Sequence, residues 1–190
     1  MAKDTYISFE VLKSHEKINR DYRIWASDVG SPITVMAPHG GLIEPRTSYI
    51  ARAIARDIFN CYCFEGIREI DNGRLHITSC KFDEPHALRL IARSQTVVTV
   101  HACTDQKSRV YLGGLDERLI SVIADRLKAR GIAAEMSRSR YPGLNPVNIC
   151  NRGAARKGAQ LEVSRGLRDD LNRVDLLAAA IHTALTDFMA

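Results

Sequence analysis

The chain has 190 residues, with 27 Lys and Arg against 22 Asp and Glu. This length suits one domain over residues 1–190, and no segment approaches the run of about 20 apolar residues that a membrane span needs. The first 22 residues are charged and lack the apolar centre of a secretory signal, so we expect a soluble, cytoplasmic protein.

Short runs rich in β-branched and aromatic residues, bounded by turn residues, predict strands. These runs are YRIWAS, ITVMA, NCYCFEGI, LHITSC, TVVTVHA, RVYL and AQLEVS, at residues 22–27, 33–37, 60–67, 75–80, 96–102, 109–112 and 159–164. Helical periodicity predicts helices over residues 48–59, 84–94, 116–131 and 174–189. This alternation indicates a single α/β domain with a mixed or mostly parallel open β-sheet flanked by helices.

His39 and Glu44 follow the apolar run ITVMAP, at the strand end where open α/β sheets place their ligand sites. Gly40 and Gly41 between them permit a tight turn, so the two side chains can converge. We expect Glu44 to open the next helix, with Pro45 in its first turn, where the missing N–H costs nothing.

His101 ends the run TVVTVHA in the same relation to its strand. Two histidines and one carboxylate at one sheet edge are the ligand set of a catalytic zinc site with an open fourth position. Each histidine taken alone is more often a hydrogen-bonded structural residue. Cys103 is an alternative soft ligand, although a closed thiolate site would leave no room for catalytic water.

Glu162 lies inside the apolar run AQLEVS and is the only acid between residues 137 and 168. Burial beside a metal would set its pKa for accepting a proton from water and passing it to a leaving amine. The alternative is a structural ion pair with Arg165 or Arg168.

The same stretch is basic, which attracts anions through the local potential. Its basic residues are Arg138, Arg140, Arg152, Arg156, Lys157, Arg165 and Arg168. A solvated basic face and a nucleic-acid surface are alternatives, but Tyr141 is the only aromatic residue there, which argues against stacking on single strands.

Several motifs together resemble the phage-type poly-γ-glutamate hydrolases over most of the chain and in order: APHGGLIEPRTS, LHITSCKFDEP, TVVTVHAC, LGGLD and NRGAARKGAQLEVSRGLR. That family is similar in fold and metal centre to zinc carboxypeptidases, with a mixed open sheet and helices on both faces. The resemblance implies one zinc per chain held by His39, Glu44 and His101. It also implies Glu162 as the catalytic glutamate and cleavage of γ-glutamyl amide bonds inside the polymer.

The motif NICNRG precedes the glutamate-bearing strand, and an arginine there could clamp a substrate carboxylate through two hydrogen bonds. Asn151 and Arg152 are therefore predicted to bind substrate, with Arg165 as a competitor for the same role. His76 could line the site too, but a histidine at a strand end explains it equally well.

The sequence thus predicts a zinc-dependent endo-hydrolase whose partner is an acidic polymer, with no nucleic acid or membrane partner and a monomer as the default. A zinc amidase or carboxypeptidase acting on another peptide, such as a cell-wall peptide, would share the metal chemistry. A non-catalytic protein that binds anions or nucleic acid is the alternative from another class.

Overall fold

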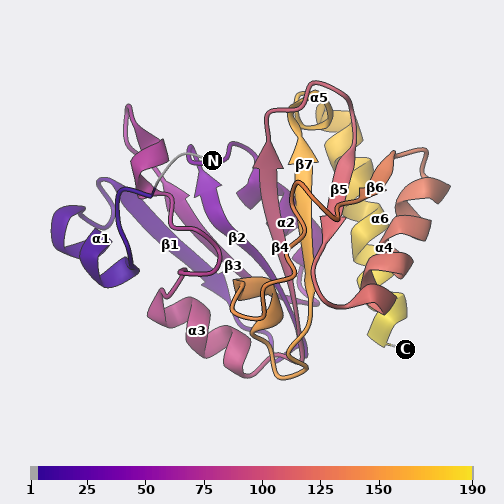
Figure 1. Cartoon of the computed structure of the whole chain (residues 1–190), viewed down its shortest axis with the longest axis horizontal. Coiled ribbons are helices and arrows are strands. Elements are labelled where there is room, and N and C mark those ends of the chain that lie inside the picture. Colours follow the sequence, from indigo (N-terminus) through magenta and orange to yellow (C-terminus); the bar gives the residue numbers. More distant parts are fainter. Residues whose placement is uncertain (1–3, 190) are drawn as a thin grey trace.

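A seven-stranded mixed sheet in the order β1-β3-β2-β4-β7-β5-β6 organises the molecule (Figure 1). The computed structural model describes residues 4–189, which form one α/β domain. The strands are β1 (Tyr22–Ser27), β2 (Ile33–Gly41), β3 (Asn60–Gly66), β4 (Thr96–Cys103), β5 (Val110–Gly113), β6 (Ala134–Met136) and β7 (Ala159–Ser164). The pairs β3–β2, β2–β4 and β4–β7 are parallel, whereas β1 is antiparallel to β3 and β5 is antiparallel to β7. The predicted fold class is confirmed.

Helices cover both faces of the sheet (Figure 1). They are α1 (Phe9–His15), α2 (Thr47–Ala55), α3 (Pro85–Ala92), α4 (Glu117–Ala129), α5 (Arg165–Arg168) and α6 (Leu171–Met189), with 3-10 turns η1 (Asn72–Leu75) and η2 (Ile149–Asn151). Among the described residues, no helix combines the length and the apolar character that crossing a membrane requires.

Two hydrophobic cores explain why the central strands read as continuous apolar runs. In β2, Val35 packs with the core under α2, α4 and α6, whereas Met36 belongs to the opposite core with Leu12 of α1 and Leu90 of α3. Successive side chains of a strand point to opposite faces, so a strand covered on both sides must be apolar at every position. The two cores hold the central strands in place from both faces. Because β3, β2, β4 and β7 are parallel, their carboxyl ends lie along one edge of the sheet.

Two predicted elements differ from the structure. Residues 76–80 form a loop rather than a strand, because the Asp4 carboxylate accepts hydrogen bonds from the Thr78 N–H and hydroxyl at 3.0 and 3.1 Å, in place of a neighbouring strand. Helix α2 begins at Thr47, so Glu44 does not open it and Pro45 lies before its first turn, contrary to prediction. Arg46 directly before the helix has φ of 74°, a left-handed conformation that a right-handed helix cannot include.

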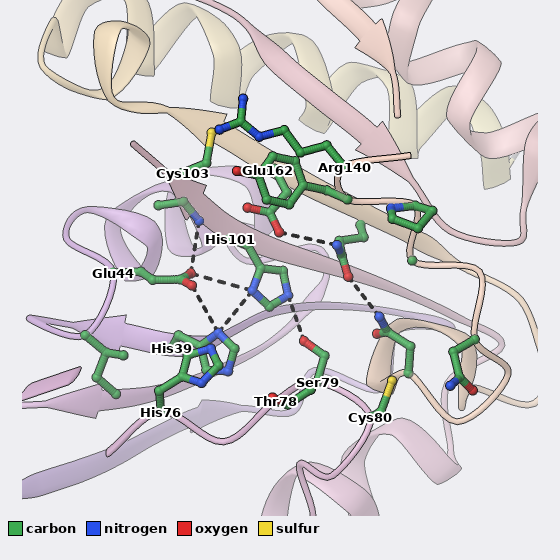
Figure 2. Close-up of a pocket in the computed structure, with 18 of the residues that line it drawn as sticks. His39, Glu44, His76, Thr78, Ser79, Cys80, His101, Cys103, Arg140 and Glu162 are labelled. Carbon is green, nitrogen blue, oxygen red and sulfur yellow. Dashed lines mark hydrogen bonds and ion pairs between the residues drawn. The ribbon is translucent and has the colours of Figure 1, made fainter. Parts of the chain in front are cut away.

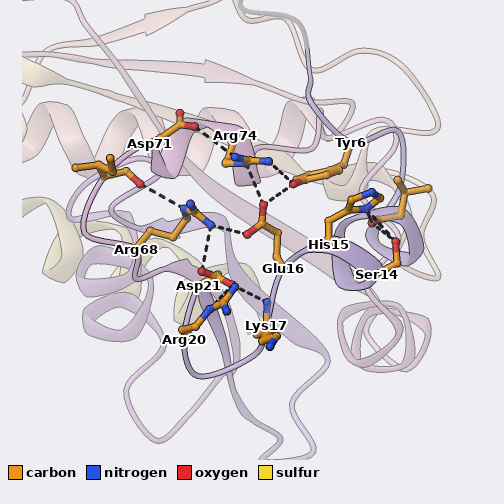
Figure 3. A network of polar contacts seen from close by, with 12 residues as sticks. Tyr6, Ser14, His15, Glu16, Lys17, Arg20, Asp21, Arg68, Asp71 and Arg74 are labelled. Carbon is orange, nitrogen blue, oxygen red and sulfur yellow. Dashed lines mark hydrogen bonds and ion pairs between the residues drawn. The ribbon is translucent and has the colours of Figure 1, made fainter.

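A polar network anchors the segment that contains α1 to the loop before η1 (Figure 3). Glu16 is buried and forms ion pairs with Arg68 at 2.6 Å and with Arg74 at 2.9 Å, and it also accepts a hydrogen bond from the Tyr6 hydroxyl. Removing one partner of such a buried pair would leave an uncompensated charge, which is strongly destabilising. The network fixes η1, which leads directly into the 76–80 loop.

Candidate metal centre and its cavity

The three predicted ligand residues lie together at the carboxyl ends of β2 and β4 (Figure 2). His39 Nδ1 lies 3.1 Å from His101 Nδ1 and 3.3 Å from Glu44 Oε1, and His101 Nδ1 lies 3.5 Å from Glu44 Oε2. One donor atom from each residue falls within a group spanning at most 4.8 Å. Parallel strands bring these side chains together although His39 and His101 are 62 positions apart.

Two glycines allow the chain to fold back between His39 and Glu44. A Cβ atom on Gly40 would lie 2.1 Å from the Ser48 hydroxyl oxygen, and Gly41 has a φ of 64°, which favours glycine. The turn closes with a hydrogen bond of 2.8 Å from the Glu44 N–H to the His39 carbonyl. Gly40 and Gly41 are the last residues of β2 and the chain turns over Leu42 and Ile43, so the predicted convergence of the two side chains is confirmed although the turn lies after the glycines.

Contacts on the far sides of the imidazole rings settle which nitrogens face the cluster. A carbonyl oxygen can only accept, so His39 Nε2 carries the proton it donates to Ile77 O at 2.8 Å. His101 Nε2 lies 3.4 Å from the Ser79 hydroxyl. With Nε2 protonated, each ring directs its Nδ1 lone pair toward the centre of the cluster, where a metal would bind. A hydrogen-bond partner on the far nitrogen is typical of metal-binding histidines.

The donor set fits a zinc ion. Nitrogen and oxygen ligands at about 2.0–2.1 Å from a tetrahedral zinc lie about 3.3 Å apart, close to the separations found here. Burial opposes ionisation of Glu44, but the charge of His39 and the hydrogen bonds from both histidines hold its pKa well below the usual range. Burial lowers the pKa of His101, yet Glu44 outweighs it and raises the pKa overall. The raised pKa keeps a proton on His101 beside the Glu44 carboxylate. A metal cation in place of that proton would interact favourably with His39, Glu44 and His101 together.

Glu162 forms part of the wall of the cavity above the cluster, which has a volume of about 580 Å³ (Figure 2). It pairs with His101 across the parallel strands β4 and β7. Only 8% of its surface is exposed, and burial raises its pKa to about 7, although the charges of His101 and Arg140 oppose this. Gln160 Nε2 donates to Glu162 Oε1 at 3.3 Å. Within the described chain no arginine pairs with Glu162, so the alternative ion pair is absent.

Known proteins resemble this chain both in sequence and in overall structure. The sequence model of the poly-gamma-glutamate hydrolase family matches residues 6–187. The chain belongs to this family. A bacteriophage poly-gamma-glutamate hydrolase has a similar structure, with a TM-score of 0.92 and 30% identity, covering 98% of this chain and 99% of that one. The predictions of the family and of a hydrolase are confirmed.

Two further likenesses concern YndL proteins. A zinc-free YndL structure superposes with a TM-score of 0.93 at 30% identity, and the match covers 99% of this chain and 100% of that chain. The UPF0714 protein YndL of Bacillus subtilis (strain 168) is 35% identical over 172 residues, or 90% of this chain and 68% of that protein. The structural match of this poly-gamma-glutamate hydrolase family member to YndL therefore covers nearly its whole chain.

Three residues predicted to bind substrate do not line the cavity of this hydrolase. Asn151 is fully buried and donates to Gly143 O at 2.7 Å, so it holds a loop together. Arg152 donates to Phe82 O at 2.9 Å, and Arg165 lies on the surface. Their predicted role has no support from their position, because η2, which Asn151 and Arg152 end, and helix α5, which Arg165 begins, do not place their side chains in the cavity wall.

Two residues that were not among the predicted substrate-binding residues do line the cavity. Arg140 is its only lysine or arginine, and its guanidinium carbon lies 5.3 Å from the centre of the Tyr141 ring. His76 Nδ1 lies 2.9 Å from the Asp4 carboxylate, and its ring centre is 4.0 Å from that of His39. No periodicity marks either position. Gln160, in contrast, could have been found from strand alternation, since it lies two residues before Glu162.

Proposed function

We propose that this protein hydrolyses γ-amide bonds inside poly-γ-glutamate chains, using one zinc ion held by His39, Glu44 and His101 and a proton carried by Glu162. The observation that carries the proposal is the convergence of these four side chains at one cavity in a member of this family. When bound, zinc supplies Lewis-acid polarisation of a carbonyl and activation of water.

The position of Glu162 supports its role as general base and acid. Gln160 occupies Oε1, which leaves Oε2 free to accept a proton from the attacking water. Gln160 is itself oriented, because its Oε1 accepts a hydrogen bond of 2.9 Å from Asn148 Nδ2. Glu162 then returns the proton to the amide nitrogen as the C–N bond breaks, giving a γ-carboxylate and a free α-amine.

The charges of the cavity favour an internal unit of the polymer over its carboxyl end. An internal γ-linked glutamate carries one free carboxylate, whereas the unit at the carboxyl end carries two. Arg140 is the one guanidinium in the cavity, and among the described residues no acidic side chain pairs with it, so it is available for a single carboxylate. The other basic residues of the anion-attracting stretch at residues 138–168 do not line the cavity.

Incubation with long poly-γ-glutamate should shorten the polymer early, before free glutamate accumulates. Polymer size is followed by gel filtration and glutamate by amino-acid analysis, at low and high salt. Affinity for the polymer should fall at high salt, since screening weakens exposed charge contacts beyond about 8 Å at physiological ionic strength. A parallel panel contains an α-linked glutamate polymer and a neutral peptide amide. Steady release of single glutamates from polymers of nearly constant length would contradict internal cleavage. Cleavage of the neutral peptide alone would contradict the substrate.

Arg140→Met should raise KM for poly-γ-glutamate and lower kcat/KM by about tenfold or more, because a hydrogen bond to a charged group contributes about 1.5–3 kcal/mol. Turnover at saturation should change less. Arg130→Met removes the same charge from an exposed position outside the cavity and serves as the control. Equal effects of the two substitutions on kcat/KM would show that Arg140 acts only through net charge.

A further inference from the structure

Arg168 is a buried arginine whose guanidinium has no carboxylate partner within the described chain. It ends the short helix α5 directly after β7, only 8% of its surface is exposed, and it does not line the cavity. Burying a charge without a counter-ion is costly unless hydrogen bonds compensate it. The partners of Arg168 therefore indicate why this position holds an arginine.

Three backbone carbonyls from three separate segments surround the guanidinium. Nη1 donates to Pro45 O at 2.7 Å, Nη2 to Cys103 O at 3.1 Å and Nε to Val163 O at 3.1 Å. One carbonyl belongs to the turn after β2, one to the end of β4 and one to β7. The planar group thus joins the carboxyl ends of three neighbouring strands.

Each of these carbonyls lies next to a residue of the proposed centre. The first follows Glu44 directly, the second comes two residues after His101, and the third follows Glu162 directly. A shift of any of the three strand ends would move both a carbonyl of Arg168 and a side chain of the centre. The distances among Glu44, His101 and Glu162 therefore depend on the rigid guanidinium of Arg168.

Close packing holds α5 in the position that this contact requires. A Cβ atom on Gly166 would lie 1.9 Å from the Gln106 carbonyl oxygen, and the Gly166 N–H donates to Asp105 O at 3.1 Å. On the other side, the Arg46 guanidinium donates to the carbonyl of Arg168 itself. Both the loop after β4 and the turn after β2 are therefore fastened to α5.

We propose that Arg168 is a positioning residue that sets the spacing of Glu44, His101 and Glu162 from behind the cavity. The role rests on the proposed zinc-dependent function. Three hydrogen bonds in a fixed fork need a guanidinium, because lysine offers a single flexible ammonium group and cannot hold three carbonyls at these angles. The positive charge of Arg168 also acts on the Glu44 carboxylate through space, from outside the cavity.

The test compares Arg168→Lys and Arg168→Met with the wild type. Zinc affinity is measured by competition with a chelator, and kcat and KM with poly-γ-glutamate. Both variants should bind zinc about 10- to 100-fold more weakly, as is typical when groups that orient metal ligands are lost. They should also lose kcat more than KM, even with saturating zinc. Arg173→Met is the matched control, since Arg173 also donates to a backbone carbonyl, Gly131 O at 3.3 Å, away from the cavity.

Melting curves of the metal-free proteins separate positioning from folding. A folded Arg168→Lys variant with wild-type zinc affinity and kcat would overturn the proposal, and so would unfolding of both variants, which would make Arg168 a residue of the fold as a whole. A wild-type protein that hydrolyses the polymer without zinc would contradict the proposed function. Zinc-dependent wild-type activity with unchanged variants would contradict only the role of Arg168.

Discussion

Glu162→Gln is expected to lower turnover by about two to four orders of magnitude, the usual size of a general acid–base contribution. The amide keeps the shape of the side chain but cannot accept the proton from water. Zinc affinity should stay near the wild-type value, because the proposed ligands lie on β2, β4 and the turn after β2. Initial rates on poly-γ-glutamate and zinc content of the same preparation check both parts.

The same substitution should stabilise the metal-free protein at alkaline pH. Folding raises the pKa of Glu162 from 4.5 to about 7, so ionisation of the buried carboxyl opposes folding. The wild type should lose stability as the pH rises from about 4.5 through about 7, whereas glutamine has no charge to bury. At pH 8 the variant should gain on the order of 3 kcal/mol, at about 1.4 kcal/mol for each pKa unit.

Urea denaturation of the metal-free proteins at pH 5 and pH 8 measures this gain. Glu135→Gln, which changes an exposed carboxylate paired with Arg109, is the control. Near-normal turnover of Glu162→Gln with intact zinc would leave Glu162 without a catalytic role. Equal stability of the two proteins at pH 8 would show that the Glu162 carboxylate is better solvated than its burial indicates.

His39→Ala should remove tightly bound zinc and abolish hydrolysis. The proposed site then keeps two ligands, and the remaining Nδ1 and carboxylate groups cannot complete a zinc centre. Zinc should also stabilise the wild type, by about 4 kcal/mol when its free concentration is a thousand times the dissociation constant. A chelator should therefore lower the melting temperature of the wild type and leave that of His39→Ala unchanged.

His182→Ala provides the control for this experiment. His182 lies on α6 with Nδ1 2.8 Å from Ile54 O, so it is also a hydrogen-bonded histidine, but it does not line the cavity. A full equivalent of zinc at unchanged affinity in His39→Ala would show that His39 is not a ligand. Retained zinc together with lost activity would make His39 a residue that orients substrate or another side chain.

The sequence predicts which side chains converge at the candidate metal centre better than it predicts which basic residues line the cavity, for a physical reason. His39 and His101 end apolar strands, and parallel strands bring their carboxyl ends to one edge, so chain position alone indicates that they converge. Arg140, Arg152 and Arg165 lie outside regular strands, where no period tells which way a side chain points. The pattern of charges identifies the basic stretch but not the one arginine that enters the cavity.

The loop at residues 76–80 illustrates a second limit. Its β-branched residues suit a strand, but the hydrogen-bond partner of Thr78 is Asp4, 74 positions away, and nothing local reveals this contact. Likewise, Arg46 in a left-handed conformation delays the helix that Pro45 favours. The γ-linkage of the substrate was implied only by the resemblance to a family, because a zinc centre of this kind suits several amide bonds.

The division of the centre between strands has a practical consequence for measuring active enzyme. The proposed zinc ligands come from β2, the turn after it and β4, whereas Glu162 comes from β7 and faces the site only while it pairs with His101. A slip of one residue along β7 would turn Glu162 to the opposite face and leave the zinc ligands in place. Zinc content therefore counts molecules with intact β2 and β4 ends, whereas turnover counts only those in which β7 is also in register. A concentration of active sites derived from metal analysis alone is an upper bound.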